Sequence, residues 1–360
     1  MHFFGATPVR LLIIGPSWIG DMVMAQSLFR CLLARQPDLV IDVLALDWTR
    51  DLLVRMPEVN QAITMPVGHG ELALGKRLQL ARQLRENDYQ QVIVLPNSFK
   101  SALIPFFAGI PLRTGWRGEA RSWLLNDCRI LDEQVYPLMV QRFAALAFPA
   151  GSVLPDPLPR PVLKASGDTG ALKKSFGLTA SRPVVVFCPG AEYGSAKQWP
   201  EAHFAKVADV LISEGKQVWL LGSKNDRPAA ENIIAGMNPG HREHCSSLAG
   251  LTSIGEAIDL LSEADSVISN DSGLMHIAAA LNKPLVVLYG STSPEFTPPM
   301  ADKVEILSLN LDCSPCFKRE CPLGHLNCLR KLLPAMVIEA LDRLDSGKTA
   351  QTSARAGIQE

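Results

Sequence analysis

The chain has 360 residues, of which 47% are hydrophobic and 20% are charged, as in an ordinary soluble globular protein. This length exceeds what one hydrophobic core usually holds, so two domains are expected. The formal net charge of −1 gives little support to non-specific nucleic-acid binding through a basic surface, and a nucleic-acid partner is not expected.

The first half alternates apolar strand-like runs with helix-like stretches. Strands are predicted at residues 9–14, 40–46 and 91–95, and a helix from Asp21 to about Arg35. This β-α repetition predicts a parallel sheet. The apolar run at 102–112 is interrupted by proline and glycine and is too short to cross a bilayer as a helix, so no transmembrane anchor is expected.

Five prolines between residues 148 and 163 predict an extended connector. We therefore expect an N-terminal domain at 1–150, a linker at 151–165 and a C-terminal domain at 166–345. The polar residues 346–360 are expected to form a disordered tail.

Beyond the connector the β-α alternation resumes. Strands are predicted at 184–188, 217–221, 266–269 and 285–289, and helices at 201–214, 254–263 and 273–281. The fold class is therefore α/β, with two Rossmann-like, doubly wound parallel-sheet domains. Such domains bind ligands at the carboxyl ends of their strands, where loops can face one another across a cleft.

Two motifs of the second half indicate a nucleotide-sugar site. Asp271, Ser272 and Gly273 occupy a strand-to-helix corner, where free backbone N–H groups and the positive end of a helix dipole favour an anion. Gly190 follows the strand at 184–188, and Lys197 is placed to neutralise a diphosphate as a point charge. The alternatives are that Asp271 and Ser272 only cap a helix and that Lys197 is a solvated surface charge.

The segment Gly15-Pro16-Ser17-Trp18-Ile19-Gly20-Asp21 ends the first strand and begins the first helix. It lacks the G-x-G-x-x-G pattern and has an aspartate where a Walker loop has lysine. A carboxylate there would repel phosphates, but it could take a proton from a sugar hydroxyl. The alternative is a first-turn aspartate that stabilises its helix by about 0.3–1 kcal/mol.

These segments, together with residues 95–102, 113–119 and 296–299, resemble the lipopolysaccharide heptosyltransferases over roughly residues 9–344. The resemblance implies the GT-B architecture, with the donor in the C-terminal domain and the acceptor mostly in the N-terminal one. It also implies inverting transfer of L-glycero-D-manno-heptose from ADP-heptose to the first heptose of the lipopolysaccharide inner core (heptosyl-Kdo2-lipid A), with Asp21 as general base. The expected location is cytoplasmic, peripheral on the inner face of the inner membrane.

Other readings stay open at this point. The acceptor could be that of another heptosyltransferase, acting on Kdo-lipid A, or the protein could be a non-catalytic nucleotide-sugar sensor. An NAD-dependent oxidoreductase would suit the fold, but the dinucleotide fingerprint is missing.

The resemblance assigns further residues to the two substrates. Leu251 and Thr252 are expected near the nucleobase, although Leu-Thr could equally begin a helix, and His276 is expected to hold the Ser272 corner or to be a satisfied buried histidine. Acceptor contacts are expected from the motif residues Ser17, Trp18, Gly20 and Asn97 and from the cationic side chains of Lys100, Arg113, Arg117 and Arg121. Scattered solvated charges are the alternative for the cations, and Trp116 or Trp123 could stack on a sugar or rest on a membrane.

No cofactor is required by the sequence, because no D-x-D pair adjoins the donor motif, although Mg²⁺ assistance is compatible with it. Four of the eight cysteines, Cys313, Cys316, Cys321 and Cys328, form a C-x2-C-x4-C-x6-C pattern. This spacing could place four thiolates around a structural zinc ion, with free or redox-labile thiols as the alternative.

Overall fold

The computed structural model describes residues 9–68, 71–179 and 181–346. The chain forms two compact units, Met1–Pro161 and Val162–Glu360, whose boundary falls in the proline-rich connector. No helix or strand is formed between Ala147 and Gly170 in this described stretch. Of the expected tail, residues 347–360 lie outside the described residues.

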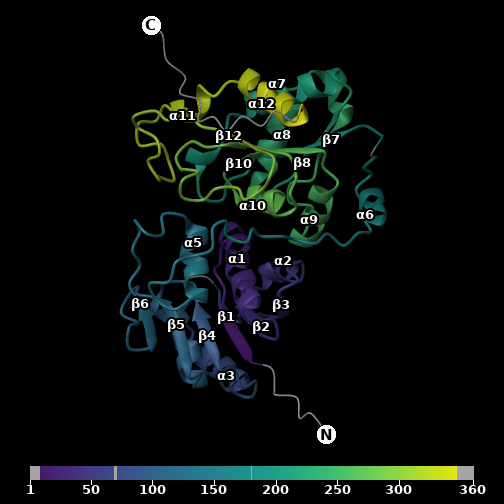
Figure 1. Ribbon diagram of the computed structural model, residues 1–360. Coiled ribbons are helices and arrows are strands. Elements are labelled where there is room, and N and C mark those ends of the chain that lie inside the picture. The colour runs from purple at the N-terminus through teal and green to yellow at the C-terminus, as the bar shows by residue number, and fades with distance from the viewer. Residues whose placement is uncertain (1–8, 69–70, 180, 347–360) are drawn as a thin grey trace. The chain divides into compact units, whose positions relative to one another are not determined.

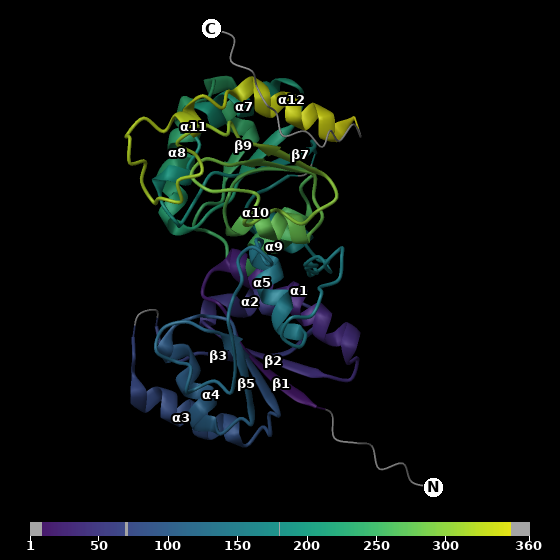
Figure 2. The same ribbon diagram turned by 60° about the vertical axis from the view of Figure 1, so that its left-hand side comes forward.

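The first unit contains a six-stranded parallel sheet in the order β3-β2-β1-β4-β5-β6 (Figure 1). Its strands are β1 (Arg10–Ile14), β2 (Val40–Ala45), β3 (Val59–Thr64), β4 (Gln91–Val94), β5 (Leu112–Trp116) and β6 (Asp127–Arg129). Its helices are α1 (Ile19–Arg35), η1 (Asp47–Thr49), α2 (Arg50–Leu53), α3 (Leu74–Arg85), η2 (Phe99–Ala102), α4 (Leu103–Ala108), α5 (Met139–Ala144) and η3 (Ala145–Ala147). The core on one face packs α3 and α4 against Leu12 and Ile14 of β1 (Figure 2).

The second unit repeats this plan with the order β12-β11-β10-β7-β8-β9. Its strands are β7 (Val184–Cys188), β8 (Gln217–Leu220), β9 (Cys245–Ser247), β10 (Ser266–Asn270), β11 (Leu285–Leu288) and β12 (Val304–Leu307). Its helices are α6 (Gly170–Ser175), η4 (Ser195–Lys197), α7 (Glu201–Ser213), η5 (Lys224–Asp226), α8 (Arg227–Gly236), η6 (Pro239–His244), α9 (Ile254–Ser262), α10 (Gly273–Ala280), α11 (Asn327–Arg330) and α12 (Pro334–Asp345). Helices α7 and α12 cover one face of the sheet, and α9 and α10 cover the other (Figure 1). Every residue of β7 is buried, as expected for a strand covered on both faces.

The predicted α/β class with two doubly wound parallel sheets is confirmed. The predicted strands and helices agree with the structure to within two residues at each end. Five strands were not predicted from the sequence: β3, β5, β6, β9 and β12, which are edge strands or lie next to an edge. Strand β3 is largely accessible to solvent, so it lacks the continuous apolar run that marks a central strand.

The strand order decides where each unit can bind a ligand. In the first unit β1 lies between β2 on one side and β4 on the other. In the second unit β7 is flanked in the same way by β8 and β10. A crevice at the carboxyl ends of such a strand pair is the usual ligand site of a doubly wound sheet. Within the described ranges, no helix is both long and apolar enough to cross a bilayer.

Candidate functional site

A cavity of about 530 Å³ opens at the carboxyl ends of β1 and β4 in the first unit. Gly15, Pro16 and Ser17 line it after β1, and residues 95–98 line it after β4. Its walls combine apolar side chains with a few polar ones, the usual make-up of a small-molecule site. The segment 15–21 is therefore part of a ligand-sized hollow.

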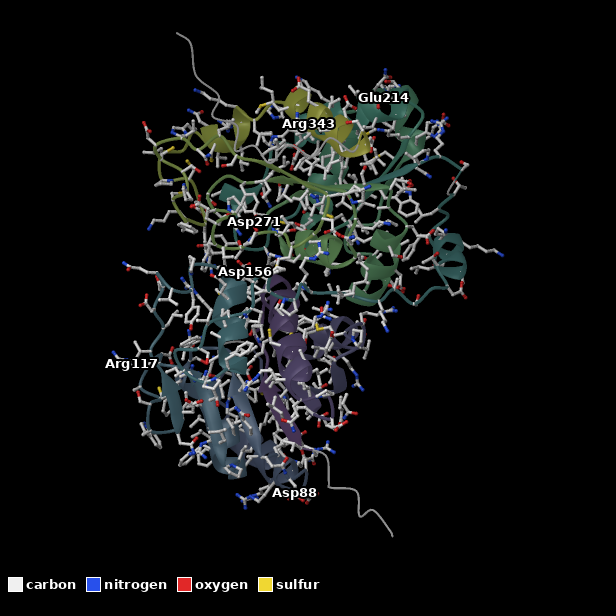
Figure 3. The ribbon with its side chains drawn as sticks, in the orientation of Figure 1. Asp88, Arg117, Asp156, Glu214, Asp271 and Arg343 are labelled. Carbon is white, nitrogen blue, oxygen red and sulfur yellow. The ribbon has the colours of Figure 1, made fainter. Side chains whose placement is uncertain are left out.

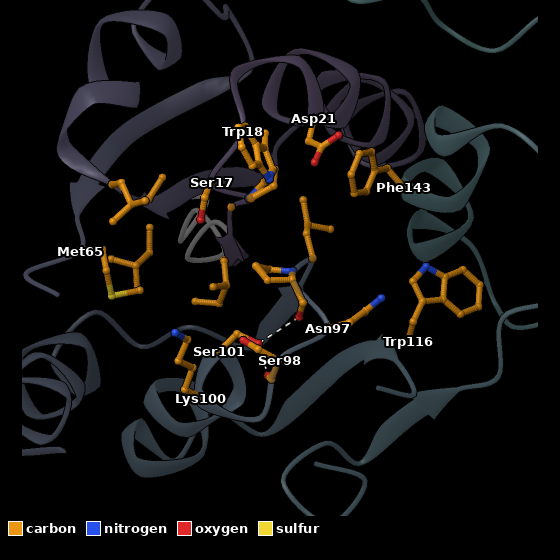
Figure 4. Close-up of a pocket in the computed structure, with 18 of the residues that line it drawn as sticks. Ser17, Trp18, Asp21, Met65, Asn97, Ser98, Lys100, Ser101, Trp116 and Phe143 are labelled. Carbon is orange, nitrogen blue, oxygen red and sulfur yellow. Dashed lines mark hydrogen bonds between the residues drawn. The ribbon is translucent and has the colours of Figure 1, made fainter. Parts of the chain in front are cut away.

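Asp21 lies in the first turn of α1 and lines this cavity. Figure 4 shows its carboxylate directed into the hollow between Trp18 and Phe143. The N-cap residue of α1, Trp18, offers no side-chain cap to the helix. Asp21 can therefore favour the positive helix end and still present a proton acceptor to a ligand.

Four of the predicted acceptor residues line the same cavity: Ser17, Trp18, Asn97 and Lys100. Trp18 is 45% exposed and can offer its ring to a ligand. Lys100 extends its ammonium group along the cavity wall (Figure 4), and no ion pair to it is found within the described ranges. Gly20 is part of α1 and does not contribute to the lining.

The predicted cluster of arginines is not brought together in the cavity. Arg113 donates to the carbonyl oxygens of Leu124 and Ile110 and lies over the ring of Phe106. Arg117 is exposed and lies at the outer edge of the first unit near β6 (Figure 3). Neither arginine lines the cavity.

Arg121 is fully buried and supports the loop after β4. Its Nη1 donates to the Pro96 carbonyl and to Ser101 Oγ, and its Nη2 donates to Asn97 Oδ1 at 3.0 Å and to the Trp116 carbonyl at 2.6 Å. Burial lowers the pKa of its guanidinium below the ordinary value. The contacts make Arg121 a residue that positions Asn97, with no surface left for an acceptor.

Sequence reasoning did not assign Met65, Ser98, Arg142 and Phe143 to a site, yet they line the cavity. Trp116, considered for sugar stacking, also lines it, and its indole N–H donates to the Arg142 carbonyl at 2.9 Å. Met65 follows β3, and Phe143 lies in α5, so these residues reach the cavity from distant elements. No local motif marks them.

In the second unit the loops after β7 and β10 are tied together by Asn270. Its Nδ2 donates to the Pro189 carbonyl at 2.6 Å, and its Oδ1 accepts from the Trp199 backbone N–H at 3.2 Å. Asn270 is fully buried. The two predicted donor motifs are thus held at one strand pair, the counterpart of the β1/β4 pair.

Lys197 and Asp271 form an ion pair of 2.6 Å. Asp271 is 4% exposed and also accepts from Thr292 Oγ1 at 2.5 Å, a partner that sequence reasoning missed. The Lys197 ammonium lies 5.1 Å from the ring centroid of Tyr193. Figure 3 shows Asp271 near the start of α10. A fixed ammonium at this corner can bind an anion as a point charge.

The remaining corner residues shape the backbone. Ser272 is the N-cap residue of α10, and its backbone is extended. Its side chain makes no capping hydrogen bond, and Gly273 is the first residue of the helix. A Cβ atom on Gly190 would overlap the Asp226 carboxylate, so only glycine fits there without displacing that side chain. The first N–H groups of α10 therefore remain available to an anion.

His276 lies one turn into α10 and is 6% exposed. Burial lowers its pKa to about 4, and the Lys197 charge adds to this while Asp271 opposes it. The imidazole is therefore neutral near pH 7, which fits the expectation of a buried histidine behind the corner.

Leu251 and Thr252 follow Gly250 after β9. Leu251 is 53% exposed, and Gly250 has a φ of +68° with Lys224 packed where a Cβ would lie. The pair therefore lies beside the loop after β8, on the β9 side of the sheet. Contact with a nucleobase stays a prediction.

The four clustered cysteines are unpaired and line one small cavity together with Ala196 and Ser291. Burial, and then the neighbouring thiols of Cys313, Cys321 and Cys316, raise the pKa of Cys328. As the side chains of the described residues stand, no three Cys, His, Asp or Glu residues form a ready metal-ligand group.

Comparisons with known proteins place this geometry in context. The sequence profile described as glycosyltransferase family 9 (heptosyltransferase) matches residues 77–327. The chain is 49% identical to lipopolysaccharide heptosyltransferase 2 of Escherichia coli K12 over 93% of this chain and 98% of that protein. It is 48% identical to lipooligosaccharide heptosyltransferase 2 of Haemophilus ducreyi, covering 93% and 99%. The solved structure of E. coli ADP-heptose lipopolysaccharide heptosyltransferase II matches with a TM-score of 0.86 and 46% identity, covering 95% of this chain and all of that one.

Proposed function

The chain belongs to glycosyltransferase family 9, the heptosyltransferase family, and from this premise we propose that it transfers L-glycero-D-manno-heptose from ADP-heptose to the first heptose of the lipopolysaccharide inner core. The observation that carries the proposal is the near-full-length identity to proteins named heptosyltransferase 2. The chemistry of the two strand-pair corners supports it.

In the proposed reaction an acceptor hydroxyl oxygen attacks the anomeric carbon of the donor heptose. The new carbon–oxygen bond forms as the bond from that carbon to the ADP oxygen breaks on the opposite face, so the configuration inverts. Asp21 takes the proton of the attacking hydroxyl. General-base help of this kind contributes about 10²–10⁴-fold, or roughly 3–5 kcal/mol of barrier.

The donor is assigned to the second unit. Lys197 and the free N–H groups at the start of α10 would bind the diphosphate, and the ammonium would neutralise it as it leaves. Asp271 would accept from a heptose hydroxyl while Thr292 keeps its carboxylate in place. The transfer as proposed requires no metal, because Lys197 supplies the positive charge. Mg²⁺ assistance would appear as a gain of rate when Mg²⁺ is added to the reaction.

The acceptor is assigned to the cavity of the first unit. Among its polar groups, Ser17 and Asn97 can bond to sugar hydroxyls, and the Lys100 ammonium suits an acidic or phosphate substituent. Because the acceptor is a lipid, we propose that the protein acts in the cytoplasm, peripherally on the inner membrane. Trp123 is 64% exposed and packs beside Phe99 and Phe106, which gives this unit an apolar surface suited to that contact.

The test is mass spectrometry of the protein incubated with ADP-heptose and Kdo2-lipid A carrying one heptose, beside the same acceptor carrying none. Gain of one heptose on the first acceptor alone is expected. Gain on the bare acceptor would reassign the step, and gain on neither would favour a nucleotide-sugar sensor.

The base role is tested by Asp21→Asn, which we expect to slow turnover about 10²–10⁴-fold while leaving ADP affinity unchanged. Asp51→Asn is the matched control, because Asp51 lies in the first turn of α2 and does not line the cavity. Near-normal turnover of the Asp21 variant would remove the base assignment.

A further inference from the structure

The cysteine-rich segment between Leu311 and Cys328 gathers its four thiols around one small hollow. Its volume of about 20 Å³ is enough for one sphere of the size of a water molecule or a metal ion. The hollow is lined by the four cysteines and by few polar groups besides them. Soft sulfur ligands in a group of four are typical of zinc and iron–sulfur sites.

The backbone of this segment turns tightly around two of the sulfurs. Gly324, with a φ of +69°, donates its N–H to the Cys321 carbonyl at 3.0 Å. Phe317, directly after Cys316, has a φ of +52°, which is uncommon for a bulky residue and is held by its N–H bond to the Ser291 carbonyl. These turns hold Cys316 and Cys321 beside the hollow that both residues line.

We propose that Cys313, Cys316, Cys321 and Cys328 bind one zinc ion, and that this ion holds the segment against the loop that carries Lys197. Side-chain rotation is needed to bring the sulfurs into tetrahedral arrangement, because they do not form a ligand group as they stand among the described residues. Zinc suits the proposal because four cysteine sulfurs are one of the usual ligand sets of its closed, tetrahedral structural sites.

The segment contacts the Lys197 loop directly. The Arg319 carbonyl accepts from the Ala196 N–H at 3.0 Å, and a side chain on Gly194 would overlap that carbonyl. Tyr193 donates its hydroxyl to the Phe317 carbonyl at 2.8 Å, and its ring faces the Lys197 ammonium. The position of Lys197 therefore depends on the backbone of the cysteine-rich segment.

The same segment also supports the other side of the ion pair. Phe317 donates its N–H to the Ser291 carbonyl at 2.7 Å, and Ser314 donates its hydroxyl to the Gly290 carbonyl. Thr292, which follows Ser291 in the chain, donates its hydroxyl to the Asp271 carboxylate. An ion bound by the four thiols would thus fix both partners of the donor corner without touching the donor.

The first test measures metal in the full chain, prepared under reducing conditions without chelator. Elemental analysis is expected to find about one zinc per chain, and a chain that lacks it is expected to take up one equivalent from a Zn²⁺ solution. Cys321→Ser should lose the zinc, whereas Cys128→Ser should keep it, because Cys128 lies in β6 of the other unit. No zinc in the isolated chain and no uptake would overturn the proposal, as would a disulfide between two of the four cysteines under these conditions.

The second test measures ADP binding by calorimetry before zinc removal, after removal with a chelator, and after Zn²⁺ is added back. ADP affinity is expected to fall about tenfold, within the roughly 5- to 150-fold range of couplings between sites, and to recover with the ion. Circular dichroism of the same samples separates this effect from unfolding. Equal affinity with and without zinc would overturn the positioning role.

This proposal rests on the donor assignment made above, but the two fail separately. A chain that transfers heptose and contains no zinc would overturn only the metal site. A chain that binds zinc and ADP but transfers no heptose would overturn only the proposed reaction.

Discussion

Protonation of His276 should destabilise the second unit as the pH falls from 7 to 5. The side chain is 6% exposed, and its pKa is about 4 because burial disfavours the charged imidazole; Asp271 opposes this lowering of the pKa, and Lys197 adds to it. In the unfolded chain the same group has the ordinary pKa of 6.5. Between these values the unfolded state binds one proton more than the folded state.

Because of this difference in bound protons, the free energy of unfolding falls as the pH is lowered. The stabilising contribution of the neutral histidine is fully present above pH 6.5 and is lost as the pH falls toward 4. Each pH unit inside this window costs about 1.4 kcal/mol of the free energy of unfolding. The proton-linked loss between pH 7 and pH 5 is therefore about 2 kcal/mol.

The assay is urea unfolding at several pH values, followed by the fluorescence of Trp199 and Trp219, which are buried in the second unit. His276→Gln keeps a neutral polar side chain that cannot be protonated, so its stability should decline about 2 kcal/mol less than that of the wild type over this range. His244→Gln, at a position 30% exposed, is the matched control and should follow the wild type. The reasoning is refuted if the His276 variant loses stability with pH as steeply as the wild type does.

Two further substitutions test the ion pair and the buried arginine. Lys197→Met should weaken ADP binding about 10- to 150-fold, the usual effect of one charge-assisted contact. It should also destabilise the unit, because among the described residues the Asp271 carboxylate then keeps only the Thr292 hydroxyl as a partner. Unchanged affinity in calorimetry would contradict the donor role. Arg121→Lys should lower the free energy of unfolding of the first unit by about 3 kcal/mol, because a lysine cannot reproduce its four hydrogen bonds. A denaturation midpoint equal to that of the wild type would show that these bonds are not needed.

Much of the candidate site was readable from local sequence. Asp21 was singled out because it lies at a strand-to-helix corner, which a parallel sheet places at its carboxyl edge. Ser17 and Asn97 were expected there because the motifs that contain them resemble those of the lipopolysaccharide heptosyltransferases. The local sequence did not show which of the two cations, Lys100 or Arg121, would line the cavity. Both are cations in a short segment, but Lys100 lines the cavity whereas Arg121 is enclosed by carbonyl oxygens that come from separate loops.

The sequence by itself determined the alternation of strands and helices, because continuous apolar runs and helical spacing are local properties of the chain. It also determined which corners carry Asp21, Lys197 and Asp271. Only the tertiary structure decided that Lys197 meets Asp271 from 74 positions away, with Thr292 as a third member. Such contacts depend on the order of strands in the sheet, and strand order brings together residues whose separation along the chain gives no sign of their pairing.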